Sequence, residues 1–178
     1  MTGEDGEFTL VHGSPRDPVW EYLTHLSAAR LNFSYFQTLY CLVGHTHVPL
    51  VFQHPLPVAP AGPAGLAGPV ADGGRPDPVD RSTEYETIVP QPGLPFALGA
   101  NRLIVNPGSV GQPRDGNPDA SYMLFESAPA AGAGGAPGGA ARGTLTLRRV
   151  TYPVASVQQK MRQAGLPSRL IMRLTYGW

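Results

Sequence analysis

The chain has 178 residues, of which 42% are hydrophobic, and its 13 acidic and 13 basic side chains give a formal net charge of zero. This length suffices for one domain with a modest core. The single cysteine, Cys41, excludes an internal disulfide framework, and we find neither a membrane-spanning apolar run nor a signal peptide. We therefore expect one cytoplasmic domain over residues 1–178 with no membrane partner, and Cys41 as a buried, unreactive thiol.

Short apolar runs and helix signals alternate in the first half of the chain, and strand signals cluster in the second half. Asp17 and Pro18 form a typical helix start, with Asp17 as N-cap and Pro18 at the first helical position. In chain order we predict a strand at residues 8–11, helices at 19–30 and 33–39, strands at 41–44, 49–52, 83–89, 101–105, 121–126 and 144–152, and helices at 154–163 and 168–174. The order predicts a mixed α/β layered domain.

Two segments of biased composition interrupt these elements. Residues 54–80 are rich in proline, alanine and glycine, and residues 127–143 are almost entirely alanine, glycine and proline. Neither segment has the periodic bulky side chains that could bury a face. We expect both to be loops that are dispensable for folding.

The zero net charge hides an asymmetry along the chain. Residues 1–126 hold all 13 acidic groups against 6 arginines, which gives −7, whereas residues 127–178 carry +7 and no acid. Such a basic segment could attract phosphate-bearing ligands or nucleic acid. Aromatic residues do not interleave with its arginines in a stacking pattern. We therefore favour solvated arginines, or arginines packed on the acidic remainder, and expect no nucleic-acid partner.

The most informative stretch is Gly44-His45-Thr46-His47, which directly follows the apolar run at residues 41–43. Neutral imidazole is the commonest side-chain metal ligand, and extended backbone turns residues i and i+2 to the same side. His12 follows an earlier predicted strand in the same way, and a loop that begins at Asn106 follows a later one. Each histidine alone could be an ordinary hydrogen-bonded residue at a strand end.

Together, three stretches resemble the C-terminal half of the calcineurin-like metallophosphoesterases, in particular their small bacterial branch. The family pattern is D-x-H, G-D, G-N-H-D/E, a lone His and G-H-x-H. The matching stretches, within about residues 8–126, are His12-Gly13-Ser14-Pro15, Gly44-His45-Thr46-His47 and Asn106-Pro107-Gly108-Ser109-Val110-Gly111. The first three family motifs, which carry the carboxylates, have no counterpart in this sequence.

The resemblance implies part of a four-layer αββα sandwich, a mixed sheet with flanking helices, and a metal-dependent phosphoester hydrolase of the bacterial cytoplasm. It implies that His12 and His45 bind one divalent cation and His47 a second, the metals being Mn, Fe, Ni or Zn. It assigns no catalytic residue. Candidate substrate-binding residues are Ser14, Arg16, Asn106, Gly108, Ser109 and Arg114.

Several of these assignments have structural alternatives. Ser14 could stabilise a turn or the start of a helix, Gly108 could be required by a tight turn, and Arg114 could pair with Asp115 or Asp119. Because the carboxylate motifs are absent, we expect either an enzyme that is incomplete in this chain or a non-catalytic binding or regulatory module. Expected partners are a phosphoester substrate, either a small molecule or a phosphoprotein, and a separate N-terminal half or a second copy.

Overall fold

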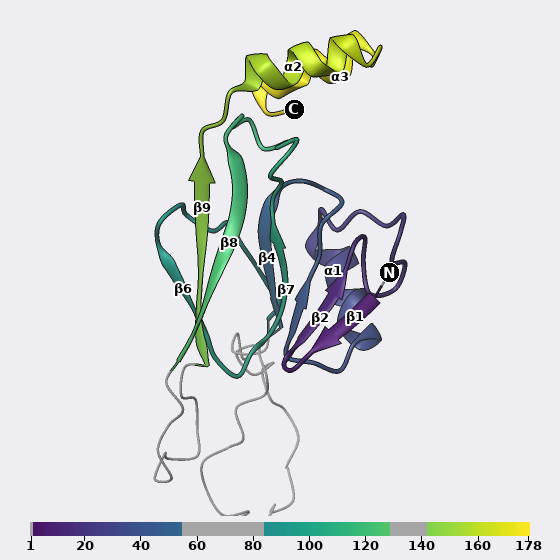
Figure 1. Ribbon diagram of the computed structural model, residues 1–178. Coiled ribbons are helices and arrows are strands. Elements are labelled where there is room, and N and C mark those ends of the chain that lie inside the picture. Colours follow the sequence, from purple (N-terminus) through teal and green to yellow (C-terminus); the bar gives the residue numbers. More distant parts are fainter. Residues whose placement is uncertain (1, 55–83, 129–141) are drawn as a thin grey trace, which may run out of the picture.

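A computed structural model describes residues 2–54, 84–128 and 142–178, which form two β-sheets and three α-helices (Figure 1). The larger sheet contains, in spatial order, β1 (Thr2–Asp5), β2 (Phe8–Val11), β3 (Tyr40–Leu42), β7 (Arg102–Pro107), β4 (Pro49–His54) and β5 (Glu86–Ile88). The smaller sheet contains β6 (Pro95–Leu98), β9 (Gly143–Val150) and β8 (Ala120–Ser127). The helices are α1 (Leu26–Asn32), α2 (Val154–Gln163) and α3 (Ser168–Tyr176), and a 3-10 turn spans Phe33–Tyr35.

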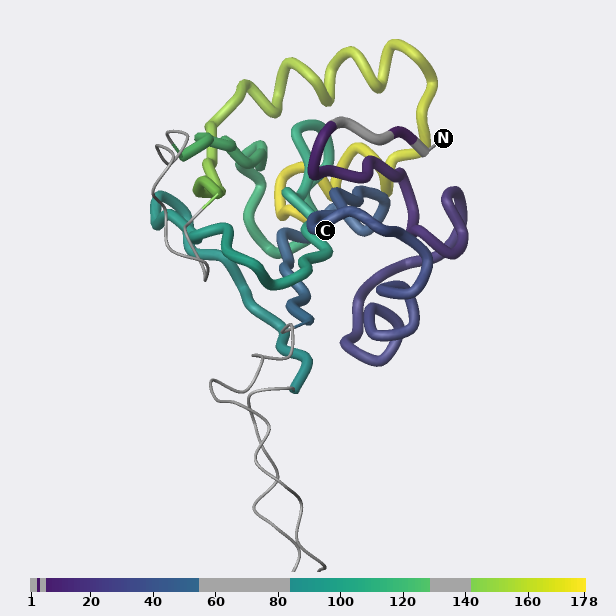
Figure 2. Tube along the Cα trace, turned by 90° about the horizontal axis from the view of Figure 1, so that it is seen from below, coloured from purple at the N-terminus to yellow at the C-terminus, as the bar shows by residue number. Residues whose placement is uncertain are grey.

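The larger sheet is mixed, as the sequence predicts. Strands β2, β3 and β7 run parallel to one another, whereas β1 and β4 run antiparallel to their neighbours. The smaller sheet is antiparallel throughout. Figure 2 shows the N-terminal strands on one side of the molecule and the strands of the smaller sheet on the other. The described part of the chain is thus mixed α/β, with one mixed sheet and one small antiparallel sheet.

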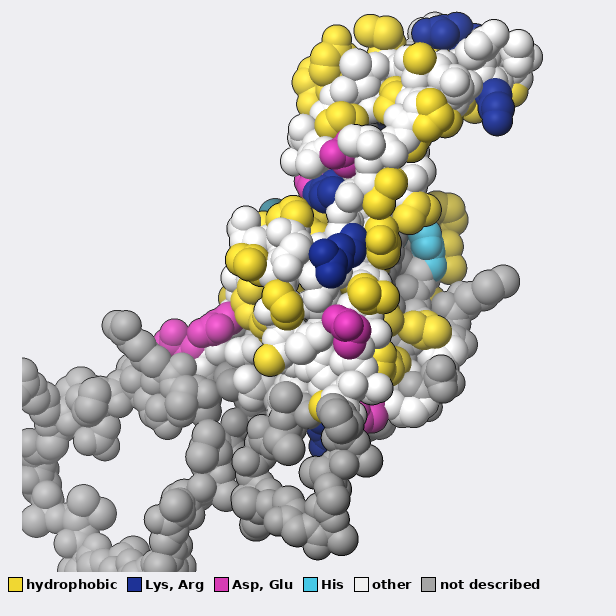
Figure 3. Space-filling model, turned by 60° about the vertical axis from the view of Figure 1, so that its left-hand side comes forward, with side chains coloured by type: hydrophobic (Ala, Val, Ile, Leu, Met, Phe, Trp, Pro, Cys, Tyr) yellow, Lys and Arg dark blue, Asp and Glu magenta, His cyan; other side chains and the backbone are white. Residues whose placement is uncertain are grey.

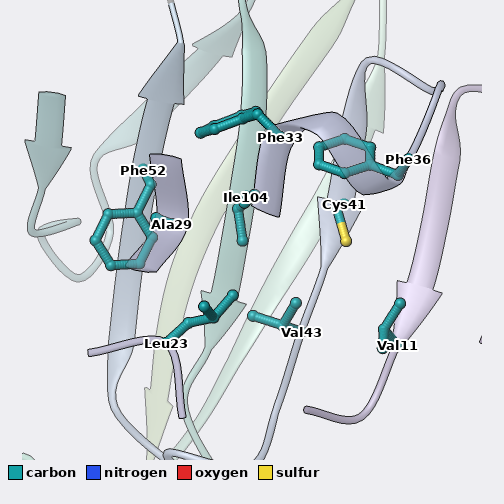
Figure 4. Close-up of a cluster of buried hydrophobic side chains, with 9 residues drawn as sticks. All are labelled: Val11, Leu23, Ala29, Phe33, Phe36, Cys41, Val43, Phe52 and Ile104. Atoms are coloured by element: carbon teal, nitrogen blue, oxygen red, sulfur yellow. The ribbon is translucent and has the colours of Figure 1, made fainter. Parts of the chain in front are cut away.

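Each face of the larger sheet has its own hydrophobic cluster. One face packs against α1 and the 3-10 turn, where Phe33, Phe36, Phe52 and Ile104 are buried together (Figure 4). The other face packs against the smaller sheet through Leu103, Val105, Leu98 and Leu145, among others. The larger sheet therefore lies between a helical layer and the smaller sheet.

Most predicted strands are confirmed, with boundaries moved by a few residues. The segments predicted as strands at 8–11, 49–52, 121–126 and 144–152 correspond to β2, β4, β8 and β9. Strands β1 and β6 were not predicted. The low-complexity segments lie almost wholly outside the described residues. Their end residues His54, Ser127 and Gly143, which were predicted to belong to loops, are in strands.

The helix predicted at residues 19–30 is wrong over most of its length, because α1 begins only at Leu26. Asp17 does accept hydrogen bonds from the backbone N–H groups of Val19 and Trp20, as an N-cap would. However, the carbonyls of Asp17 and Pro18 accept from the N–H groups of Ser14 and Gly13, which lie earlier in the chain. The segment therefore closes a turn instead of propagating a helix.

A cluster around Glu21 holds this turn in place, and we call Ser14, Arg16, Glu21 and Asn32 the Glu21 cluster. The Glu21 carboxylate accepts hydrogen bonds from the Ser14 hydroxyl, the Asn32 amide and the Arg16 guanidinium. Asn32 also accepts from the backbone N–H of Arg16 at 2.9 Å. The side chain of Asn32 is thus used within this cluster, and where a helix was predicted at 33–39 only the 3-10 turn forms.

The C-terminal helices form a hairpin that stands off one end of the sheets (Figure 1). Their predicted positions are confirmed, and the Gln158 amide joins them by donating to the carbonyl of Ile171 and the hydroxyl of Thr175, each at 2.8 Å. Figure 3 shows Lys and Arg side chains on this hairpin. None of the helices in the described ranges is both long and apolar enough to cross a bilayer.

Cys41 is fully buried on β3, which leads to a prediction about its reactivity. Burial raises the pKa of the Cys41 thiol to about 12, against a weaker opposing effect of Arg102. Because the thiolate is the reactive form, we expect the native protein to react with Ellman's reagent at pH 8 at least ~100-fold more slowly than the urea-unfolded chain. Equal rates, followed by absorbance, would contradict the buried position.

Candidate metal centre

His12 and His45 meet at one edge of the larger sheet. Their strands, β2 and β3, are parallel neighbours, so the loops that follow them begin side by side. Just past the strand ends, the backbone N–H of Gly44 donates to the carbonyl of His12 at 2.9 Å. The convergence of His12 and His45 at the carboxyl ends of adjacent strands is therefore as the sequence predicts.

The two imidazole rings present nitrogen atoms to each other. His12 Nε2 and His45 Nδ1 form a hydrogen bond of 2.9 Å, in which the tautomers decide which nitrogen donates, and the ring centroids are 4.8 Å apart. Two nitrogen ligands this far apart, each about 2.1 Å from a shared cation, subtend an angle of about 90° at the ion. An angle near 90° is compatible with octahedral coordination once the hydrogen bond between the rings is replaced by the ion.

His47 is oriented by a different contact. Its Nδ1 lies 2.8 Å from the carbonyl oxygen of Gln112, which can only accept a hydrogen bond. Nδ1 therefore carries the proton in the neutral ring, and Nε2 keeps its lone pair. A histidine whose second nitrogen donates to a backbone carbonyl is the usual arrangement for metal ligands.

The described residues do not contain a complete cluster of ligands. Among them, no group of three or more His, Cys, Asp or Glu side chains is close enough together to hold a metal ion. His47 is thus not gathered with His12 and His45 around one point. The assignment of His12 and His45 to one cation and of His47 to a second stays a prediction.

Asn106, at the end of β7, binds the loop of residues 44–47, which carries His45 and His47 and which we call the histidine loop. Its amide donates to the carbonyl of Gly44 at 2.6 Å and to the hydroxyl of Thr46 at 2.8 Å, and its oxygen accepts from the N–H of Gly108 at 2.9 Å. Asn106 is only 3% exposed. All of its polar atoms are therefore used in connecting two loops, and it acts as a positioning residue for His45.

The histidine loop has an unusual backbone. His45 and His47 have φ angles of 59° and 63°, and among the described residues they alone combine a side chain with a positive φ. This left-handed region favours glycine, because a Cβ atom crowds the carbonyl there. The loop is held in this conformation by Asn106, by the buried Thr46 and by the bond from the Arg114 N–H to the His47 carbonyl.

The surroundings of His45 favour the neutral form of its imidazole. Burial lowers the pKa of His45 below its ordinary value, and His12, His47 and Arg114 lower it further. A contact with the backbone of Trp20 raises the pKa of His45 and so opposes this shift. Within the described ranges, however, the buried Nε2 atom of His45 has no hydrogen bond of ordinary geometry. The Tyr22 ring lies 4.0 Å from the His45 ring between centroids. Metal binding requires a neutral ring, so these effects favour a ligand role.

Several expected substrate-binding residues are engaged in local structure. The Ser14 hydroxyl and Arg16 guanidinium belong to the Glu21 cluster. Gly108 has a φ of 87°, and a Cβ atom there would lie 2.4 Å from the Ser121 hydroxyl, so the turn requires glycine. The Ser109 hydroxyl accepts from two N–H groups of its own turn, at Gly111 and Gln112.

Arg114 is placed differently from the two expected alternatives. Its guanidinium donates to the side-chain oxygen of Gln112 at 2.8 Å and 3.1 Å, and none of the carboxylates in the described ranges pairs with it. Asp115 instead forms an ion pair with Arg149. Arg114 is half-buried and close enough to lower the pKa of both His45 and His47. Its charge thus lies near the histidines, while the guanidinium itself faces Gln112.

The C-terminal helix α3 also borders the site, which the sequence did not indicate. The carbonyl of Gly177 accepts from the Gly116 N–H at 2.9 Å, and a Cβ on Gly177 would lie 2.6 Å from the backbone of Asn117. Arg173 on α3 adds to the effects that lower the pKa of His47, after burial and Arg114. No local sequence pattern links a helix at residue 173 to a loop at residue 47.

Comparison with known proteins places this geometry in a class. The fold matches a crystal structure of a metallophosphoesterase from Sphaerobacter thermophilus with a TM-score of 0.71 and 37% sequence identity, over 99% of this chain and 59% of that one. An uncharacterised protein of Methanocaldococcus jannaschii is 25% identical over 167 residues, which is 93% of this chain and 50% of its relative. No protein-family model matches the chain.

The chain is thus a partial-length relative of a bacterial metallophosphoesterase. It spans about half the length of the curated relative and 59% of the solved structure. Its two sheets and flanking helices resemble part of a metallophosphoesterase fold.

Proposed function

We propose that this chain carries the imidazole part of a two-cation phosphoesterase site, within a four-layer αββα sandwich to which it contributes a mixed sheet. The observation that carries the proposal is the 2.9 Å separation of His12 Nε2 and His45 Nδ1. A purely structural histidine pair would show this same hydrogen bond, so the surroundings of the pair decide between the two roles. Here the pair lies near His47, whose Nε2 atom keeps its lone pair, and near Arg114, which pairs with none of the carboxylates in the described part of the chain.

In this proposal His12 and His45 hold one cation through the facing nitrogens, and His47 holds a second through Nε2. Mn, Fe, Ni and Zn all accept imidazole ligands. When bound, such cations polarise a phosphoryl group and acidify a water molecule. The chain's own contribution is to keep the imidazoles neutral and fixed, His45 through Asn106 and His47 through Gln112.

Two imidazoles do not complete a metal site, since structural zinc sites take four protein ligands and catalytic ones three. We propose that carboxylates from outside the described residues, on a separate polypeptide or a second copy, complete the coordination. The substrate is proposed to be a phosphoester of a small molecule or a phosphoprotein. Arg114 is the candidate that contacts it, because a planar guanidinium matches phosphate oxygens.

The test combines metal binding with hydrolysis. We expect Mn²⁺ to broaden the imidazole NMR resonances of His12 and His45 selectively, and expect this broadening to fade below about pH 6 as imidazole protonates. Hydrolysis of bis-p-nitrophenyl phosphate by the chain alone should be very weak, because the carboxylates are missing. The control is the double variant His45→Ala, His47→Ala.

Each result separates the alternatives. Robust turnover that is lost in the double variant would show that acids of this chain, such as Asp17 or Asp115, complete the site. Equal turnover in both proteins would identify a contaminating phosphatase. Selective broadening without turnover, even after carboxylates are supplied on a second polypeptide, would favour a non-catalytic metal-binding module. An absence of any selective broadening would refute the metal centre.

A further inference from the structure

A basic hollow lies on α3, near the candidate metal centre. It has a volume of about 300 Å³ and is lined by Arg169, Arg173 and Trp178. Arg169 and Arg173 are four residues apart on α3, so their side chains lie on the same face of the helix. None of the carboxylates in the described part of the chain pairs with either guanidinium. Two such guanidinium groups around one hollow give it a positive charge that suits an anion.

The stability of α3 does not account for both arginines. Arg173 lies in the last turn, where a cation complements the helix dipole. Arg169 lies in the first turn, where the dipole disfavours a cation, and no acidic residue of that turn offsets its charge. The position of Arg169 is therefore better explained by a ligand that the hollow binds.

Trp178 forms an aromatic wall of the hollow. Its backbone N–H donates to the carbonyl of Arg173 at 3.2 Å, and its ring stacks on the ring of Tyr176 with the centroids 4.8 Å apart. Trp178 is nevertheless 63% exposed, so much of its surface is open to a ligand. An exposed indole beside two guanidinium groups can stack on a planar ring that carries an anionic group.

Backbone contacts connect the hollow with the histidine loop. The carbonyl of Gly177 accepts from the N–H of Gly116, and two residues earlier the N–H of Arg114 donates to the carbonyl of His47. Figure 1 shows the end of α3 beside the loops at the same end of the sheets. Arg173 lines the hollow and is also close enough to His47 to lower its pKa. A ligand in the hollow therefore has one side toward His47.

We propose that Arg169, Arg173 and Trp178 form a subsite for a second phosphate group of the substrate and for a planar ring attached to it. The substrate class is then a phosphoester that carries another phosphate next to a ring system, as a phosphorylated nucleotide does. The two arginines bind this phosphate through their planar donor groups, and Trp178 stacks on the ring. The subsite follows from the hollow, whereas its place beside the scissile phosphate rests on the proposed function.

The experiment titrates the metal-free protein with AMP, which carries one phosphate and one planar ring. Nitrogen-15 NMR follows the arginine Nε–H groups and the indole N–H of Trp178, with the variant Trp20→Phe identifying the indole signal. We expect shifts at Arg169, Arg173 and Trp178. The variant Arg169→Gln should weaken AMP binding at least about tenfold, because it removes a hydrogen bond between charged groups.

The matched control is Arg162→Gln. Arg162 is exposed on α2, does not line the hollow and pairs with no carboxylate in the described ranges. Its charge is separated from the ligand by solvent, so the variant should weaken AMP binding by less than about twofold.

Two further probes separate the parts of the subsite. Adenosine, which lacks the phosphate, should bind at least about tenfold more weakly than AMP. Inorganic phosphate should shift Arg169 and Arg173 but leave the indole of Trp178 unchanged. The variant Trp178→Leu should bring the affinity for AMP close to that for inorganic phosphate, because it removes the stacking surface.

Three results would overturn the proposal. The first is the absence of any shift at Arg169 and Arg173 with millimolar AMP. The second is equal weakening by Arg169→Gln and Arg162→Gln, with both variants retaining the wild-type unfolding midpoint, since the attraction would then belong to the basic surface as a whole. The third is binding of adenosine as tightly as AMP, which would leave the arginines without a role.

The subsite and the metal centre are measured separately. AMP binding in the hollow without selective Mn²⁺ broadening at His12 and His45 would refute the proposed function and leave the subsite intact. Selective broadening without AMP binding would support the metal centre and refute the subsite. If AMP binds but the ring resonances of His47 do not move at constant pH, the hollow does not adjoin the metal centre, and the assignment to a second phosphate is refuted.

Discussion

Replacing Glu21 with alanine is expected to lower the free energy of unfolding by about 2–4 kcal/mol. The substitution removes the acceptor shared by the Ser14 hydroxyl and the Asn32 amide, and both residues are fully buried. The Asn32 amide keeps its bond to the Ala28 carbonyl at 3.0 Å, and the Ser14 hydroxyl keeps a weaker contact with the Asp17 carbonyl at 3.3 Å. The variant therefore leaves one buried N–H of Asn32 without an acceptor and removes the partner of the Arg16 guanidinium, and an unsatisfied buried donor is costly. The effect is measured by urea unfolding at pH 7.

The matched control is Glu86→Ala, which removes an exposed carboxylate from β5 and should change the unfolding free energy by less than about 0.5 kcal/mol. If Glu21→Ala destabilises the protein no more than Glu86→Ala, the Glu21 cluster does not hold the turn. The variant Glu21→Gln keeps an acceptor but loses the negative charge, and we expect an intermediate effect.

The same cluster makes stability depend on pH. Burial raises the pKa of Glu21, but hydrogen bonds from Ser14, Arg16 and Asn32 outweigh it, so the pKa lies below its ordinary value of 4.5. A lowered native pKa means that the stabilisation is fully present above pH 4.5 and is lost as the pH falls through the native pKa. The difference in unfolding free energy between wild type and Glu21→Ala should therefore shrink below pH 4.5.

Replacing Asn106 with alanine is expected to cost about 2–4 kcal/mol and to disrupt the histidine pair. The substitution leaves the Gly44 carbonyl, the Thr46 hydroxyl and the Gly108 N–H without their shared partner in a buried region. His45 then loses the contact that holds its loop. We expect the selective Mn²⁺ broadening of His12 and His45 to weaken at least about tenfold under conditions in which the variant is still folded.

Asn117→Ala is the control for this effect. Asn117 lies in the loop that follows β7, and within the described ranges its side chain accepts only from the N–H of Asp119. It should cost about 1 kcal/mol and leave the broadening unchanged. If the two asparagine variants lose metal binding in proportion to their stability, Asn106 has no specific role in positioning His45.

Much of the fold was predictable where one local signal decides the structure. The strand at 8–11 is a short apolar run next to a turn, and α2 has a helical pattern ending near Gly165, whose φ is 69°. The helix predicted to follow Asp17 did not form, although Asp17 does bind backbone N–H groups as an N-cap would. The reason is that the carboxylate of Glu21 is bound by residues as far away as Asn32. Such a contact leaves no trace in local periodicity.

In the candidate site, too, some contacts could be predicted from the sequence and others could not. The pairing of His12 with His45 was predictable, because parallel neighbouring strands bring their carboxyl ends to one edge. Asn106 was singled out for ligand contact, yet its side chain binds the histidine loop. The approach of Tyr22 and Arg173 depends on how a turn and a distant helix pack. Neither contact follows from the spacing of residues.

The left-handed backbone of His45 and His47 implies a trade-off between stability and function. Each non-glycine residue in that conformation costs on the order of 1–2 kcal/mol relative to glycine. A sequence selected for folding alone would place glycine at both positions. An engineered chain with His45→Gly and His47→Gly should consequently gain thermal stability while losing its imidazoles, which would make it a thermostable but metal-free scaffold for studying the rest of the domain.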